Sequence, residues 1–440
     1  MLPKILHNME VQVQRSTIIS DGGPNAPAVP ATEVPLTVFD RFASNIHIAV
    51  LFAFASPTPA NDALVDGLRN TFKHFPTLTA RLGYSLTHRR PCILMGGGGG
   101  GGAQVVEATV SSELSDHLPL KPSPELQRLH PNPGAGAQLF QVQFNRFMCG
   151  GLIIGFSVHH RVADGHSMGA FFTAWAKAVR GAPIDRLPVY DQSWLKPRRP
   201  PRCEFQHWGQ DFIPTTPHHN VLTKNVDPSK ITNILLKYPS DYLKKLKAKV
   251  DNKFTTFETL SAHLWRKITI ARRLQDYEHT TVRVPVNGRA RLKPLVSDDF
   301  FGNLVVNAYP KGNVKVLIDG GLVKAASIIH EAIAEIDKGY FQSFIDFGEL
   351  HGEEELVPAY DVDGNLLSPT LEMDSWVRFR FHEMDLGGGG ELRSFLPTWV
   401  PFEGLMMFLP GLGEEGGVDV FVTLLQDHAE LLRQISHSLD

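Results

Sequence analysis

The stretch that decides the fold reads GGLIIGFSVHHRVADG and spans residues 150–165. Its apolar, partly β-branched run predicts a buried strand. This strand ends at His159 and His160, and Asp164 and Gly165 follow on the turn. Residues 166–181 then combine helix-forming residues, apolar positions at helical spacing and a glycine just past a basic last turn. The unit is therefore a strand, a histidine turn and a helix.

The histidine turn carries groups suited to proton transfer. A neutral imidazole has an unperturbed pKa near ~6.5, so His160 can take a proton from a hydroxyl or amine and return it later. Asp164 can pair with a basic residue or orient a ring nitrogen, and Gly165 leaves room for a bend or a close approach. A satisfied core His–Asp pair is the alternative. His159 is the competing base, and only one of the two histidines can face the site, because neighbouring side chains at a strand end point to opposite faces.

Composition excludes several classes of protein. The 440 residues carry a formal net charge of −3, which gives no sign of a nucleic-acid or anionic-membrane partner. The three cysteines, Cys92, Cys149 and Cys203, have no paired metal spacing, so neither a disulfide framework nor a zinc site is expected. Residues 1–8 are too short for a signal peptide and read as a dispensable leader, and no apolar run is long enough for a membrane span. We expect a cytoplasmic protein.

The length permits two domains, and a proline-rich stretch without periodicity separates them. We expect an N-terminal domain over residues 1–181, an extended linker over 182–222 pinned by its aromatic residues, and a C-terminal domain over 223–440. Both halves mix strand and helix patterns, which predicts a pair of α/β domains with mixed sheets. The main expected elements are strands at 46–54, 231–238, 281–292 and 300–307, and helices at 61–74, 240–250, 255–267 and 321–339.

Three other stretches of the sequence have plain structural explanations. Seven glycines at 96–102 lack the lysine and hydroxyl residue that a phosphate-binding loop needs, so we expect a hairpin tip, and residues 21–32 read as a loop. The basic run at 196–202 could help to hold phosphate groups of a ligand, but a solvated linker is the safer interpretation.

The motif His-His-x-x-x-Asp-Gly resembles the signature of the BAHD family of CoA-dependent acyltransferases, and also that of chloramphenicol acetyltransferases and condensation domains. Three later segments resemble BAHD enzymes in order and spacing: TFETLSAHLWR (256–266), VNGRARL (286–292) and FFGNLV (300–305). DLGGG (385–389) stands where that family carries Asp-Phe-Gly-Trp-Gly. The resemblance covers nearly the whole chain and argues against a condensation domain, which usually belongs to a longer protein.

The resemblance implies a fold and a set of roles. The fold would be chloramphenicol acetyltransferase-like, with two domains of similar size, flanking helices and a channel between them. His160 would be the general base, acyl-CoA the co-substrate, and no metal or resident cofactor would be needed; the protein would be a monomer. The remaining residues with implied roles are Asp164 paired with Arg289 or Arg291, the motif residues Gly165, Asp385, Gly387 and Gly389, and Thr255 and Thr256 on the CoA side. Leu386 and Gly388 depart from the family pattern.

The sequence gives weaker indications of the acceptor substrate. Gly388 together with RSFLPTWVPFEGL (393–405) resembles plant enzymes that move hydroxycinnamoyl groups from CoA to agmatine, putrescine, tryptamine or serotonin. Acidic residues between Asp346 and Asp374 would favour a cationic acceptor, although a solvated acidic loop explains them as well. The alternatives are an O-acyltransferase that uses shikimate or another alcohol, and a non-catalytic descendant that binds CoA esters.

Overall fold

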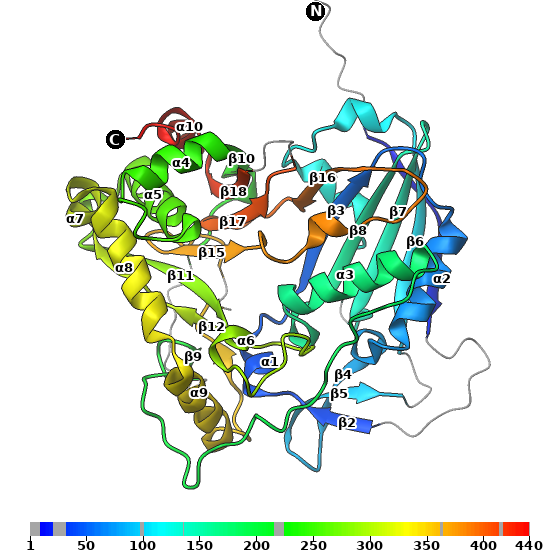
Figure 1. Cartoon of the computed structure of the whole chain (residues 1–440), viewed down its shortest axis with the longest axis horizontal. Helices are drawn as coiled ribbons and strands as arrows, with labels where there is room; N and C mark the ends of the chain where they lie inside the picture. The colour runs from blue at the N-terminus through cyan, green and yellow to red at the C-terminus, as the bar shows by residue number, and fades with distance from the viewer. Residues whose placement is uncertain are drawn as a thin grey trace, which may run out of the picture.

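The computed structural model describes residues 9–20, 32–96, 101–134, 136–214, 224–360, 364–412 and 417–439. The expected leader at 1–8, most of the loop at 21–32 and the centre of the glycine run therefore lie outside the described residues. Within them, two mixed sheets stand side by side, one from each half of the chain, and helices pack against each (Figure 1). This arrangement is the α/β architecture that the sequence predicts.

The first sheet has six strands. In spatial order they are β1 (Val11–Ile19), β6 (Ala103–Val110), β7 (Phe140–Phe147), β8 (Leu152–His159), β3 (His47–Phe54) and β16 (Leu392–Pro397). Only β6 and β7 run parallel among neighbouring strands of this sheet. The helices α2 (Asn61–Phe72) and α3 (Gly165–Val179) cover one face, as Figure 1 shows.

The second sheet is built from the other half of the chain. Its order is β10 (Ile231–Pro239), β18 (Gly417–Leu425), β17 (Leu405–Pro410), β15 (Leu371–Ser375), β11 (His279–Asn287) and β12 (Val305–Ala308), and β13 (Lys311–Asn313) also pairs with β11. The helices of this half are α4 (Ser240–Ala248), α5 (Thr256–Ala271), α6 (Gly288–Arg291), α7 (Val314–Asp319), α8 (Gly321–Glu335), α9 (Lys338–Leu350) and α10 (Gln426–Ile435). Two small sheets complete the fold: β2 (Thr32–Pro35), β5 (Arg90–Met95) and β4 (Arg81–Ser85), and β9 (Phe212–Ile213) with β14 (Val357–Pro358).

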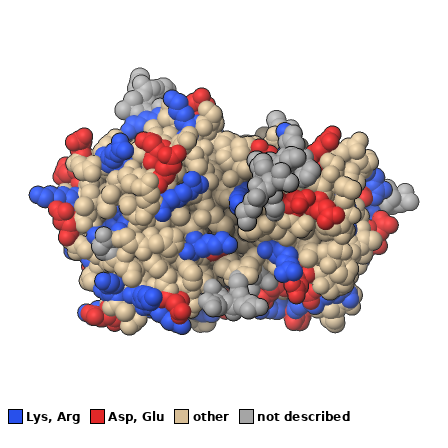
Figure 2. Space-filling view, turned by 90° about the horizontal axis from the view of Figure 1, so that it is seen from above, with Lys and Arg blue, Asp and Glu red and all other residues tan. Residues whose placement is uncertain are grey.

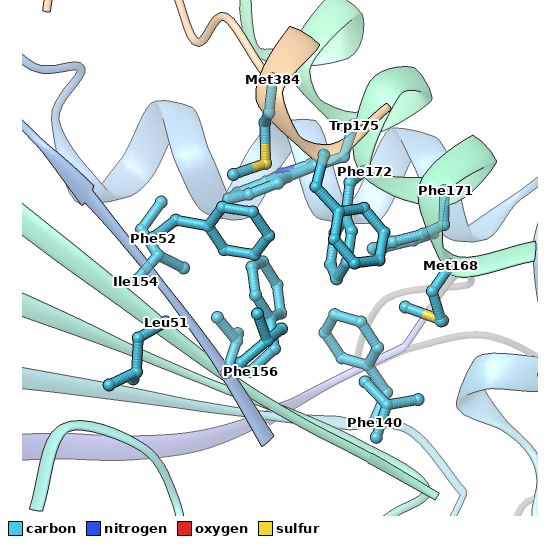
Figure 3. Close-up of a cluster of buried hydrophobic side chains, with 14 of the residues drawn as sticks. Leu51, Phe52, Phe140, Ile154, Phe156, Met168, Phe171, Phe172, Trp175 and Met384 are labelled. Carbon is cyan, nitrogen blue, oxygen red and sulfur yellow. The ribbon is translucent and has the colours of Figure 1, made fainter. Parts of the chain in front are cut away.

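Each half has its own hydrophobic core. In the first half, side chains of β3, β7 and β8 meet those of α3, and Phe156 lies with its ring centroid 4.6 Å from that of Phe172 (Figure 3). All eight residues of β8 are buried, which explains why this strand reads as a continuous apolar run. The histidine turn therefore follows a strand that is held on both faces.

Two segments cross between the halves. Strand β16 comes from the C-terminal half but pairs with β3 in the first sheet. In the opposite direction, α1 (Val38–Phe42) lies early in the chain and places Val38, Phe39 and Phe42 in the core of the second half. The domain boundaries predicted at 181 and 223 do not include this exchange. It depends on contacts between segments that are far apart in the chain.

Three expected elements differ in detail. The helix expected over 321–339 is two helices, because Asp337 caps a new one by accepting a hydrogen bond from Tyr340 N at 2.9 Å. The strand expected at 300–307 is regular only in β12, since the preceding residues bind the histidine turn instead. The strand expected over 281–292 ends at Asn287, where α6 begins with a cap from the Asn287 side chain.

Candidate active site

The histidine turn forms where β8 reaches the seam between the two halves. His159 ends the strand, His160 opens a 3-10 turn over His160–Val162, and Asp164 caps α3 by accepting a hydrogen bond from Ser167 N at 2.9 Å. The main-chain N–H of His160 donates to Ile46 O at 2.9 Å. The turn is thus fixed by the strand before it and the helix after it.

Asp164 and Arg289 form a buried ion pair across the seam. The two Arg289–Asp164 hydrogen bonds measure 2.7 and 3.2 Å, and the side chains of Arg289 and Asp164 are 2% and 3% exposed. Burial alone would raise the pKa of Asp164, but the charge and hydrogen bonds of Arg289 and the Ser167 N–H outweigh it and lower this pKa below its ordinary value. Asp164 therefore faces Arg289 and holds the two halves together at the turn.

Of the two arginines considered from the sequence, only Arg289 makes this pair. The expectation for Arg291 is corrected: its guanidinium donates to the carbonyl oxygen of Ile333 at 3.1 Å. The reason is the helical turn of α6, which points residues two apart in different directions.

The segment 300–304 binds the histidine turn through main-chain groups and through the Asn303 side chain. Arg289 donates to Phe300 O and Gly302 O at 2.9 and 3.0 Å, and Leu304 N donates to Asp164 at 3.1 Å. The side chain of Asn303 donates to His160 O at 3.0 Å. These bonds take the place of strand pairing and explain the irregular backbone here.

The two histidines differ in environment. His159 is buried, its Nδ1 accepts a hydrogen bond from Arg161 N at 3.2 Å, and its ring lies edge-on to that of His47. Burial, then the neighbouring positive groups, lower the pKa of His159 to about 3, so it is a poor proton acceptor near neutral pH. His160 is half-buried, and its Nδ1 has no hydrogen-bond partner among the described residues. The geometry favours His160 over His159 as the base.

A carboxylate near the end of β15 lies close enough to His160 for their charges to interact. Asp374 accepts hydrogen bonds from Ser375 N and Trp376 Nε1, both at 2.7 Å, and it interacts electrostatically with His160. Burial raises the pKa of Asp374 above its ordinary value, and the hydrogen bonds and His160 offset part of the rise. The neighbouring Glu372 is neutralised by Arg283 at 2.6 Å, whereas no ion pair to Asp374 is seen in the described parts of the chain.

Gly165 allows another segment to approach the turn. A Cβ atom built there would lie 2.2 Å from Cε2 of Phe379, and one built on Gly169 would lie 2.2 Å from the Phe379 carbonyl oxygen. The loop before the DLGGG motif thus packs directly on the first turns of α3. This packing requires glycine at both helix positions.

The DLGGG motif lies at the far end of α3. Asp385 forms an ion pair of 2.6 Å with Arg180, just past the helix, and accepts a hydrogen bond from Gly387 N at 2.8 Å. Gly387 and Gly389 have φ values of 77° and 89°, a conformation that favours glycine. Leu386 is buried in the first core. The motif is therefore separated from His160 by the length of the helix.

The two threonines expected on the CoA side begin α5. The Thr255 hydroxyl accepts a hydrogen bond from Glu258 N at 3.2 Å, and the Glu258 carboxylate accepts one from Thr255 N at 2.7 Å, which makes a capping box. Thr255 is exposed and Thr256 is half-exposed. Glu258 also binds His330 of α8 at 2.8 Å, so this helix start is anchored to its neighbour.

Two hollows lie along the seam on the β10 side, with volumes of about 490 and 330 Å³. The loop at residues 119–124 and β10 line them, and Trp399 completes the larger one. His160 lines neither, so the channel expected at the domain interface stays a prediction. Lys, Arg, Asp and Glu are interspersed over both halves in the view from above (Figure 2).

The structure also bears on membrane-spanning helices and metal sites, two features that the sequence analysis considered. Across the described ranges, no helix is both long and apolar enough to cross a membrane. The same residues contain no group of three or more His, Cys, Asp or Glu side chains arranged to hold a metal ion.

Sequence reasoning missed Asn303 and Asp40, whose side chains are joined by a hydrogen bond of 3.0 Å, and gave Asp374 no role beyond an acidic run. Asn303 lies in the FFGN segment that carries the family resemblance, so its position next to Gly302 was the available signal. Asp40 and Asp374 gave no such signal, because the bond of Asp40 to Asn303 and the interaction of Asp374 with His160 each join segments far apart in the chain.

Comparison with known proteins agrees with this architecture. A solved structure of vinorine synthase superposes with a TM-score of 0.72 at 18% identity, over 97% of this chain and 98% of that one. The TRI101 protein of F. sporotrichioides, solved with coenzyme A and T-2, gives a TM-score of 0.71 at 17% identity over 92% and 97% of the two chains. The chain thus has the chloramphenicol acetyltransferase-like α/β fold of these two proteins, with two mixed sheets.

Sequence comparison defines the family. The Transferase family model matches residues 9–438. Tryptamine hydroxycinnamoyltransferase 2 of Oryza sativa subsp. japonica is 37% identical over 98% of this chain and 99% of its own, and agmatine coumaroyltransferase-1 of Hordeum vulgare is 37% identical over 94% and 95%. The chain therefore belongs to the Transferase family, the BAHD acyltransferases, and is a CoA-dependent acyltransferase.

Proposed function

We propose that this enzyme transfers a hydroxycinnamoyl group, such as p-coumaroyl or feruloyl, from CoA to an amine, with His160 as the general base. The observation that carries the proposal is the carboxylate of Asp374, which interacts with His160 and has no cationic partner among the described residues. A carboxylate in this position attracts an ammonium group to the base. An alcohol acceptor is uncharged and would form no ion pair with this carboxylate.

The proposed reaction uses the Asp374 carboxylate and the His160 imidazole. The acceptor arrives as an ammonium, pairs with Asp374 and releases one proton to solvent water, which leaves a neutral, nucleophilic amine. Its nitrogen attacks the thioester carbonyl while His160 takes the second proton, and the tetrahedral intermediate then expels the CoA thiolate, which receives that proton from His160. The products are an amide and free CoA, and no acyl-enzyme is formed.

The relatives support an amine as the acceptor. Those at 34–38% identity are named for tryptamine, agmatine or putrescine. Their acyl groups vary, because two tryptamine enzymes of Oryza sativa subsp. japonica, each 38% identical, are benzoyltransferases. Benzoyl transfer to an amine is therefore the second candidate.

Other parts of the proposal rest on the family resemblance. CoA would lie against the start of α5, where Thr255 is exposed and Thr256 half-exposed. TRI101 was solved with coenzyme A, which supports CoA as the co-substrate proposed for this enzyme. We propose a cytoplasmic monomer.

The test measures thiol release from p-coumaroyl-CoA and benzoyl-CoA with agmatine, putrescine, tryptamine, serotonin, shikimate and a simple alcohol. We expect turnover with one class of amine and its loss in His160→Ala. Turnover only with shikimate or the alcohol would contradict the amine assignment. Saturable CoA-ester binding without turnover in the folded protein would favour a non-catalytic descendant.

The variant Asp374→Asn separately tests whether the Asp374 carboxylate binds the ammonium group of the acceptor. Because the amide cannot pair with an ammonium group, the variant should raise KM for the amine while binding of the acyl-CoA is unchanged. Glu372→Gln is the matched control, since Arg283 already neutralises that carboxylate. Equal effects of the two substitutions would argue against an ammonium site at Asp374.

A further inference from the structure

The ring of His160 lacks the usual orienting partner. In many general-base sites a carboxylate accepts a hydrogen bond from the second ring nitrogen. Here Asp164 is turned toward Arg289, and His160 Nδ1 has no partner within the described ranges. The direction of the ring therefore depends on the main chain that carries it.

Both main-chain groups of His160 are held, each by a different half of the molecule. Its N–H donates to Ile46 O, at the start of β3, at 2.9 Å. Its carbonyl oxygen accepts a hydrogen bond from Asn303 Nδ2, in the second half, at 3.0 Å. Asn303 is 4% exposed, so water cannot easily replace this donor.

Asn303 is held in turn by Asp40. The same Nδ2 donates to Asp40 Oδ1 at 3.0 Å, and the other oxygen of Asp40 accepts hydrogen bonds from Thr37 N and Thr37 Oγ1 at 2.9 and 2.8 Å. Asp40 is buried at 8% exposure, and burial raises its pKa. This carboxylate determines that the amide presents its NH₂ group, not its oxygen, to His160 O.

We propose that Asn303, oriented by Asp40, is a positioning residue that sets the direction of the His160 ring through its main-chain carbonyl. The proposal rests on the proposed role of His160 as the base. It assigns a catalytic consequence to a contact that joins α1, the turn and the segment 300–304. Neither Asn303 nor Asp40 is proposed to touch the substrate.

The first test is Asn303→Ala. We expect kcat to fall by about 10- to 100-fold, the range that a misplaced catalytic group produces, while KM for the amine changes little. The variant also leaves the Asp40 carboxylate without its partner, so a loss of stability alone could lower the activity. A second variant is needed to separate the two effects.

The double variant Asp40→Asn with Asn303→Asp separates them. The amide then at position 40 can accept from Thr37 with its oxygen and donate with its nitrogen to the carboxylate then at position 303, so the bond between the two side chains is restored. The His160 carbonyl, however, faces a carboxylate oxygen in this variant and has no donor. We expect the melting temperature to recover toward the wild-type value while kcat stays as low as in Asn303→Ala.

Asn145→Ala is the matched control. Asn145 is fully buried and donates to two main-chain oxygens, Leu129 O and Ile153 O, at 2.8 and 3.0 Å, far along β8 from the turn. Its substitution should lower the melting temperature but leave kcat unchanged per folded molecule. Recovery of both stability and kcat in the double variant would overturn the positioning role. Retained turnover in His160→Ala would instead overturn the proposed function.

Discussion

At the scale of single residues, charge burial decides how the histidine turn is held. Asp164 and Arg289 are almost completely buried, and together they bind Ser167, Phe300, Gly302 and Leu304. Removing two charges from water is costly, and only a complete set of partners compensates for it. The pair is therefore a rigid joint between the halves, and its loss should affect the whole fold.

Arg289→Leu should lower the free energy of unfolding by about 3–5 kcal/mol, because it leaves the Asp164 carboxylate buried without its cation. Chemical denaturation followed by intrinsic fluorescence measures this loss. Arg291→Leu is the control, since that side chain gives up one hydrogen bond to Ile333 O. A similar loss in both variants would contradict the special role of Arg289.

The lowered pKa of Asp164 makes its contribution depend on pH. A carboxyl whose pKa is depressed by folding stabilises the protein above its unfolded pKa, about 3.9, and this contribution disappears as the pH falls through the lower, folded value. Asp164→Asn should thus be destabilised at neutral pH, with the difference from wild type shrinking below about pH 4. Unfolding free energies from pH 7 to pH 3 test this. A constant difference over that range would contradict the pKa direction.

At the scale of elements, the two ends of α3 contact different parts of the molecule. Its first turn carries Asp164 and receives Phe379 at Gly165 and Gly169. Its last turn meets the DLGGG motif through the Arg180–Asp385 pair, whose side chains are 35% and 60% exposed. The motif thus orders the loop that leads into β16, at a distance from His160.

Asp385→Ala should leave kcat unchanged and cost no more than about 1 kcal/mol, because exposed ion pairs contribute little. Gly387→Ala should cost more, about 1–2 kcal/mol, since its φ of 77° lies in the left-handed region. Steady-state kinetics and thermal unfolding of the two variants distinguish these effects. A large fall in kcat for Asp385→Ala would place the motif in the catalytic machinery.

At the scale of the whole molecule, the halves are interlocked. The first sheet includes β16 from the C-terminal half, and the second core includes α1 from the N-terminal half. The linker is also fixed to the second half, because Trp208 packs on Phe347 with ring centroids 5.1 Å apart, and Arg198 pairs with Asp346 at 2.6 Å. We therefore expect that neither half folds as a self-contained unit.

Fragments cut at the sequence boundaries should therefore not fold alone. Residues 1–181 lack β16 and leave α1 without its core, so we expect this fragment to be insoluble or to lack a cooperative transition. Co-expression of 1–222 with 223–440 should restore a soluble complex. A cooperative unfolding transition in the isolated 1–181 fragment, measured by circular dichroism, would show that the domains are independent after all.

The sequence by itself determined the strand, histidine turn and helix, the α/β class and the family, because these depend on local periodicity and on motifs contiguous in the chain. Only the tertiary structure decided that Arg289 and not Arg291 pairs with Asp164, that β16 joins the first sheet, and that Asn303, held by Asp40, binds the His160 carbonyl. The physical reason is that these contacts join residues more than a hundred positions apart. Their geometry follows from how the two sheets pack, which no local pattern records.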